Sequence, residues 1–212
     1  MKLFKNIKKW LENQEHLFYL FLLILIVPNI ILCFTEPMPV VAKVCNVLLP
    51  FAFYYLLMTL SRNCGKMFWI LFLFIFFGAF QIVLLYLFGQ SIIAVDMFLN
   101  LVTTNSSEAM ELLDNLVPAL VSVIILYIPA LILAVISIIK KRKLSPEFIR
   151  RERKKAWIAL LIGFISLGAA YGLDKRYELK SDLYPANVCY NVALAFQRNA
   201  QTRTYHRTSE NF

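Results

Sequence analysis

The sequence predicts an all-α, polytopic membrane protein with five transmembrane helices, its N-terminus inside and its C-terminus outside. Of its 212 residues, 60% are hydrophobic and only 17% are charged, which is too apolar for one soluble domain. The apolar residues form five long runs, and a bilayer core of roughly 30 Å needs about 20 such residues per helix. Because these runs are continuous and do not alternate with period two, they exclude an outer-membrane barrel.

The apolar runs define the expected spans. We expect transmembrane helices over residues 17–34, 40–60, 67–88, 116–139 and 156–171. The basic start of the chain is not expected to be a cleaved signal peptide, because no small-x-small site follows the first run. The segment before that run predicts an interfacial amphipathic helix. Its apolar face comprises Leu3, Phe4, Ile7, Trp10 and Leu11.

Basic residues set the orientation, because Lys and Arg accumulate on the cytoplasmic side of short connections. Four lysines precede the first run, Arg62 and Lys66 lie in the second connection, and nine of the 22 basic residues lie between 140 and 155. The first and third connections contain no Lys or Arg. The net charge of +9 therefore indicates topology and contact with anionic membrane lipids, and nucleic acid is not an expected partner.

Side chains for metal binding or nucleophilic catalysis are scattered. The four cysteines, Cys33, Cys45, Cys64 and Cys189, show no CxxC spacing, and the two histidines fall on opposite sides of the membrane in this topology. We therefore expect no metal ligands and no catalytic residues in this chain. Cys33 and Cys45 both lie toward the outer ends of their spans, so a disulfide and isolated packing cysteines are both open alternatives.

The third connection, residues 90–115, is chemically distinct because it carries four acids and no Lys or Arg. Asn100, Thr104 and Glu108 are spaced four apart, which aligns them on one face of a continuous helix. Glu108 suits the ammonium of ethanolamine, and the amide and hydroxyl suit phosphate or glycerol oxygens. Alternatively, Asn105 caps a helix with Glu108 at its third position, which requires no ligand.

The N-x3-T-x3-E pattern at Asn100, Thr104 and Glu108, in an outer loop after the third of five spans, resembles the membrane domain of phosphoethanolamine transferases. This family includes lipid A modifying enzymes of polymyxin resistance. The tail DLYPANVCYNVALAFQRNAQTRTYHRTSENF is similar to the segment that joins the family's fifth span to its periplasmic domain. The resemblance implies that the three residues bind the phosphatidylethanolamine donor, in the bacterial inner membrane.

The same resemblance implies separate roles for the membrane part and the catalytic part of the protein. Residues 1–172 are expected to form the transmembrane domain, and residues 173–212 a periplasmic bridging segment. In the family, a sulfatase-like domain follows and holds zinc and a threonine nucleophile, so this chain is expected to be inactive alone. Its role is then to position phosphatidylethanolamine for transfer of phosphoethanolamine to lipid A or another lipopolysaccharide sugar.

Two other classes remain open from the sequence. A non-enzymatic scaffold or lipid-binding subunit would have the same spans. A small transporter would need a polar path through the bundle, and the sparse polar content of the spans speaks against it. Apart from Lys43 and residues at the ends, no ionisable residue interrupts the five runs.

Overall fold

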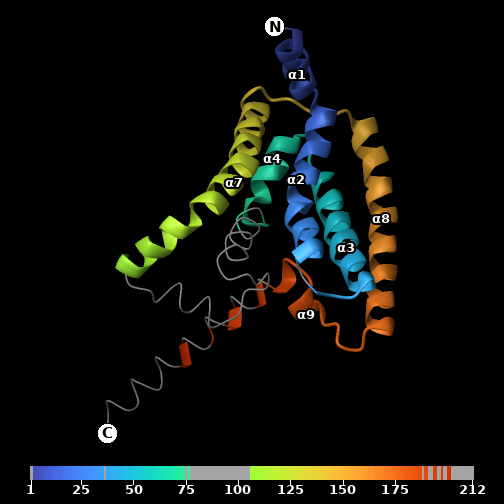
Figure 1. Ribbon diagram of the computed structural model, residues 1–212. Helices are drawn as coiled ribbons and strands as arrows, with labels where there is room; N and C mark the ends of the chain where they lie inside the picture. Colours follow the sequence, from blue (N-terminus) through green and yellow to red (C-terminus); the bar gives the residue numbers. More distant parts are fainter. Residues whose placement is uncertain are drawn as a thin grey trace.

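The computed structural model forms a helical bundle (Figure 1), and no strand occurs in the part of the chain that it describes. The described residues are 2–35, 37–74, 76, 106–187, 189–190, 193–194, 197 and 200–201, with only the backbone described for 2, 106–116, 118–120 and 181. The elements are α1 (Lys2–Glu12), α2 (Gln14–Thr35), α3 (Val40–Met58), α4 (Cys64–Ile70), α7 (Ser106–Ile139), α8 (Pro146–Leu173) and α9 (Leu179–Asp182).

Four helices in the described part of the chain are long and apolar enough to cross a membrane: α2, α3, α8 and the Val121–Ile139 part of α7. They cover four of the five predicted spans. The third predicted span, 67–88, starts inside α4, but residues 75 and 77–105 lie outside the described residues. The membrane character of the fold is therefore supported, while the count of five spans stays a prediction.

Two helices begin earlier than hydropathy predicts. The fourth predicted span starts at Leu116, whereas α7 starts at Ser106, so the last part of the predicted loop is helical and continuous with the span. The fifth starts at Ala156, whereas α8 starts at Pro146. Ser145 caps α8, its hydroxyl accepting from the Phe148 amide at 3.1 Å, and proline occupies the first helical position. The first turns of α8 are therefore rich in charged residues, and the apolar span follows in the same helix.

Small residues bring the long helices together. The most extensive packing joins α3 to α8, followed by α2 with α3 and α4 with α7. A Cβ atom added to Gly163 of α8 would lie 3.1 Å from the Leu49 Cα of α3. One added to Gly65 of α4 would collide with the carbonyl oxygen of Ala134 in α7. Backbones thus approach closely at both interfaces, as is common between membrane helices.

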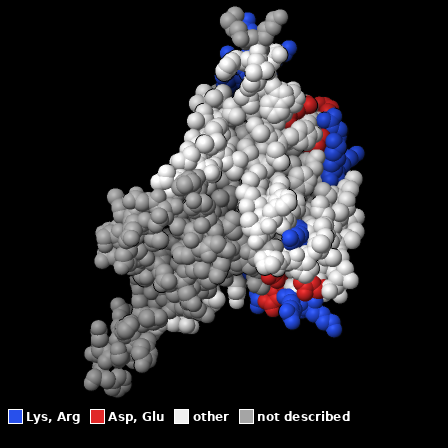
Figure 2. Space-filling model, in the orientation of Figure 1, with Lys and Arg blue, Asp and Glu red and all other residues white. Residues whose placement is uncertain are grey.

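The basic connections gather at one end of the bundle. Leu144 and Arg62 exchange hydrogen bonds, from the Leu144 amide to the Arg62 carbonyl at 2.7 Å and from Arg62 Nε to the Leu144 carbonyl at 2.9 Å. We call this the α1 end, since α1 extends from it in Figure 1, and the opposite one the α9 end. Figure 2 shows Lys and Arg on α1, Lys and Arg next to Asp or Glu at the adjoining start of α8, and a mixture of both charges at the α9 end.

A buried carboxylate fixes α8 near the α1 end. Glu152 is fully buried and accepts from Arg151 Nε at 2.9 Å and from Lys155 Nζ at 3.2 Å. Its second oxygen accepts from the Tyr55 hydroxyl of α3. Because each carboxylate oxygen has a charged or polar partner, the cost of burying the charge is offset, and α8 is held in register with α3.

Candidate lipid-binding site

The 174–187 segment folds back across the α9 end of the bundle and is held there by two buried amides. Asn29 of α2 is 0% exposed, and its Nδ2 donates to the carbonyls of Asn46 and Tyr184, both at 2.9 Å. Asn46 of α3 is 3% exposed, and its Nδ2 donates to the Asp182 carbonyl at 2.7 Å. These side chains satisfy backbone groups that would otherwise be buried without partners.

Tyr177 adds a third buried polar contact to this segment. Its hydroxyl donates to Asn46 Oδ1 at 3.0 Å. Burial raises the pKa of the Tyr177 phenol well above its usual value, so the hydroxyl stays protonated and remains a donor. The turn before it is closed by the Arg176 amide, which donates to Asp174 Oδ1 at 3.0 Å. The segment is therefore a fixed part of the bundle over these residues.

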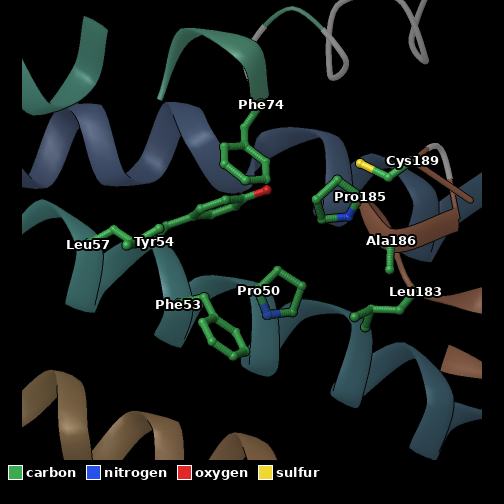
Figure 3. Close-up of a pocket in the computed structure, with 9 residues that line it drawn as sticks. All are labelled: Pro50, Phe53, Tyr54, Leu57, Phe74, Leu183, Pro185, Ala186 and Cys189. Atoms are coloured by element: carbon green, nitrogen blue, oxygen red, sulfur yellow. The ribbon is translucent and has the colours of Figure 1, made fainter. Parts of the chain in front are cut away.

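An apolar cavity of about 270 Å³ lies between α3, Phe74 and the 174–187 segment together with Cys189 (Figure 3). Helix α3 supplies one wall, and the segment supplies the facing wall. An apolar cavity of this kind, beside a helix apolar enough to cross a membrane, suits a hydrocarbon chain. The lining residues are Pro50, Phe53, Tyr54, Leu57, Phe74, Leu183, Pro185, Ala186 and Cys189.

Tyr54 lines this cavity with its ring and places one buried polar group beside it. The residue is 2% exposed, and its hydroxyl has no hydrogen-bond partner among the described residues. Its ring packs edge-on against Phe74, with 5.8 Å between ring centroids. Figure 3 shows Tyr54 reaching from α3 toward Phe74, with Pro185 beyond its hydroxyl. A buried donor without a partner costs about 1–3 kcal/mol, and a ligand with an acceptor oxygen would recover this cost once the side chains that cover the hydroxyl moved aside.

A second cavity, of about 480 Å³, opens at the α9 end between the start of α3 and the 174–187 segment. Its lining includes Asp174, Arg176 and Asp182, next to prolines 37 and 39. Charges of both signs at one mouth match a zwitterionic head group, with arginine suited to phosphate and carboxylates to an ammonium. The α9 end thus offers an apolar cavity and a polar one on the same segment.

The residues predicted to bind the donor are only partly described. Asn100 and Thr104 lie outside the described residues, and of Glu108 only the backbone is described. Because α7 begins at Ser106, Glu108 occupies its third helical position, as the capping alternative requires. Asn105, the expected cap, also lies outside the described residues. Binding by Asn100, Thr104 and Glu108 therefore stays a prediction.

The cysteines follow the packing alternative. All four are free, so Cys33 and Cys45 are not joined. Cys33 Sγ donates to the Lys43 carbonyl at 3.4 Å, and Cys45 is buried. Within the described residues, no group of three or more His, Cys, Asp or Glu side chains could hold a metal ion.

No family model matches this chain, and no match was found among curated proteins or solved structures. The fold and the cavities define a helical bundle with four helices long and apolar enough to cross a membrane, and with a segment folded over one end. The resemblance to phosphoethanolamine transferases is accordingly carried forward as a hypothesis. Asn29, Asn46 and Tyr54, which the sequence did not single out, build the α9 end.

Proposed function

We propose that this chain is the membrane domain of a phosphoethanolamine transferase, which holds phosphatidylethanolamine for transfer of its head group to lipid A or another lipopolysaccharide sugar. The observation that carries the proposal is the apolar cavity beneath the 174–187 segment, with the buried, unpartnered Tyr54 hydroxyl beside it. A diacyl lipid has both an apolar chain and a hydrogen-bond acceptor for such a cavity. One acyl chain fills the apolar space, and an ester carbonyl accepts from Tyr54.

The orientation follows from charge. Since basic connections favour the cytoplasm, the α1 end faces inward and the α9 end faces the periplasm of a bacterial inner membrane. In this arrangement Asp174, Arg176 and Asp182 lie at head-group level, together with the predicted contributions of Asn100, Thr104 and Glu108. The part of the chain after α8 then leads toward a catalytic domain outside residues 1–212.

The chain's own contribution is binding and positioning. A lipid fixed by its acyl chain and by its ester group presents its phosphate at a constant height, which lowers the entropic cost of attack. Zinc and the nucleophile belong to the catalytic domain of the family. The described residues contain no cluster of side chains that fits a metal.

The lipid-retention experiment compares Tyr54→Phe with Tyr127→Phe. Tyr127 of α7 is a matched control, because its hydroxyl is also buried without a partner but it does not line the cavity. The purified chain is equilibrated with phosphatidylethanolamine, and retained lipid is counted by native mass spectrometry. We expect Tyr54→Phe to bind about fivefold more weakly, the effect of one hydrogen bond, and Tyr127→Phe to bind as the parent.

Neither substitution should unfold the bundle, since each removes a hydroxyl that lacks a partner. A lower affinity of Tyr54→Phe for phosphatidylethanolamine would therefore reflect the loss of the contact between the hydroxyl and the lipid. Equal affinity in the two variants would contradict the assignment of the cavity to the donor lipid.

A further inference from the structure

A groove of about 330 Å³ lies at the α1 end, between α1 and the last turns of α7. Its walls are apolar and come from both helices, while its rim is charged. The groove is far from the 174–187 segment, which lies at the opposite end of the bundle (Figure 1). The walls are Phe4, Ile7, Leu11, Leu133 and Ile136, and the rim is Lys8, Glu12, Lys140 and Arg142.

The apolar wall of this groove is uncovered. Phe4 is 80% exposed and Ile7 is 49% exposed, although both belong to the apolar face of an amphipathic helix. On the facing side, Leu133 and Ile136 lie within the part of α7 that is apolar enough to span a membrane. The groove therefore adjoins hydrocarbon, and a lipid chain is the occupant that its apolar wall favours.

The rim carries three cations against one carboxylate. Lys8, Lys140 and Arg142 face Glu12, and none of the three cations takes part in the ion pairs formed by the described residues. Arg142 Nη1 donates to the backbone carbonyl of Glu12 at 3.0 Å, which ties the rim to α1 and leaves its charge uncompensated. An anion is the complement of such a rim.

The basic rim is also held in place before any ligand arrives. Lys141 has a positive φ of 48°, and the turn it makes is closed by the Arg142 amide, which donates to the Ser137 carbonyl at 3.1 Å. Asn63 Nδ2 donates to the Arg142 carbonyl at 2.8 Å. A preorganised rim loses little conformational entropy on binding, which favours selectivity.

We propose that this groove binds one anionic glycerophospholipid, with an acyl chain against the α1 and α7 walls and its phosphate between Lys8, Lys140 and Arg142. A zwitterionic lipid is disfavoured, because its ammonium group would lie among the same cations. The bound lipid covers the apolar face of α1 and fastens that helix to α7. The site is independent of the proposed function, since it uses other residues at the other end of the bundle.

The test compares phosphatidylglycerol with phosphatidylcholine of identical acyl chains, each equilibrated with the purified full chain and counted by native mass spectrometry. The parent chain is expected to retain phosphatidylglycerol preferentially. Lys8→Gln with Lys140→Gln should weaken its retention on the order of tenfold, because each cation near a membrane surface contributes substantially to binding an anionic lipid. Retention of phosphatidylcholine should not change.

The matched control carries Lys9→Gln with Lys154→Gln, which removes the same charge from exposed positions that do not line the groove. This variant should retain phosphatidylglycerol as the parent chain does. Equal losses in the two double variants would show diffuse surface attraction and overturn the proposal. The proposal would also be overturned if the parent chain retained the two lipids equally. It would be overturned as well if the Lys8→Gln, Lys140→Gln variant retained phosphatidylglycerol as the parent chain does.

Discussion

Single buried polar residues decide how the α9 end is built. Asn29 and Asn46 reach backbone carbonyls that are far away in the sequence, and Asn29 contacts Tyr184 across 155 positions. Each asparagine lies within a predominantly apolar run, so no local sequence pattern indicates its hydrogen-bond partner. Tyr54 likewise looks like an ordinary aromatic in a membrane span. The sequence therefore predicted the helices that carry these residues, but tertiary contacts were needed to find the site.

Asn46→Ala should release the 174–187 segment from the bundle. The substitution removes the side-chain partner of the Asp182 carbonyl and leaves the Tyr177 hydroxyl with only its longer contact to Cys45 Sγ, at 3.7 Å. The loss of a buried hydrogen-bond partner costs about 1–3 kcal/mol. Trypsin should then cleave at Lys175, Arg176 and Lys180 faster than in the parent chain, as followed by mass spectrometry of timed digests. Asn6→Ala, at an exposed position of α1, is the control. An unchanged cleavage rate for Asn46→Ala would mean that the amide does not anchor the segment.

At the level of helices, composition was sufficient to place most elements but not their ends. The long apolar runs correctly predicted α2, α3, and the apolar parts of α7 and α8. The start of α8 was readable in Ser145 followed by Pro146 and Glu147, an N-cap pattern that hydropathy does not measure. The start of α7 at Ser106 fits the capping alternative for Glu108, whereas a face formed with Asn100 and Thr104 lies outside the described residues.

Gly65→Ala should weaken the packing of α4 against α7. The new Cβ would meet the Ala134 carbonyl oxygen and lie 3.0 Å from the Ser137 Cβ, and backbone atoms cannot move aside without separating the helices. Overpacking of this kind costs about 1–3 kcal/mol. Thermal unfolding of the purified chain in detergent should show a lower midpoint.

Gly168→Ala in α8 is the matched control for that substitution, because nothing lies within 4 Å of the added Cβ. There the change from glycine to alanine should leave the midpoint unchanged or raise it, since alanine favours helix by about 1 kcal/mol. If both variants unfolded at the same temperature, close backbone approach would not govern this interface.

On the scale of the whole molecule, the two ends of the bundle offer different chemistry. The α1 end gathers unpaired cations around an apolar groove, and the α9 end combines an apolar cavity with charges of both signs. The charge pattern of the sequence predicted this asymmetry, because its basic connections alternate along the chain. It did not predict where a lipid would rest, because cavities arise from residues that only folding brings together.

The central claim is that the chain selects an ethanolamine head group, and the most direct test is a competition between two lipids with identical acyl chains. Phosphatidylethanolamine and phosphatidylcholine are equilibrated together with the purified chain, and retained lipid is measured by native mass spectrometry. Only the ethanolamine ammonium can donate hydrogen bonds to a carboxylate such as Glu108. We predict preferential retention of phosphatidylethanolamine, on the order of tenfold, and loss of this preference in Glu108→Ala. Equal retention of the two lipids by the parent chain would contradict it.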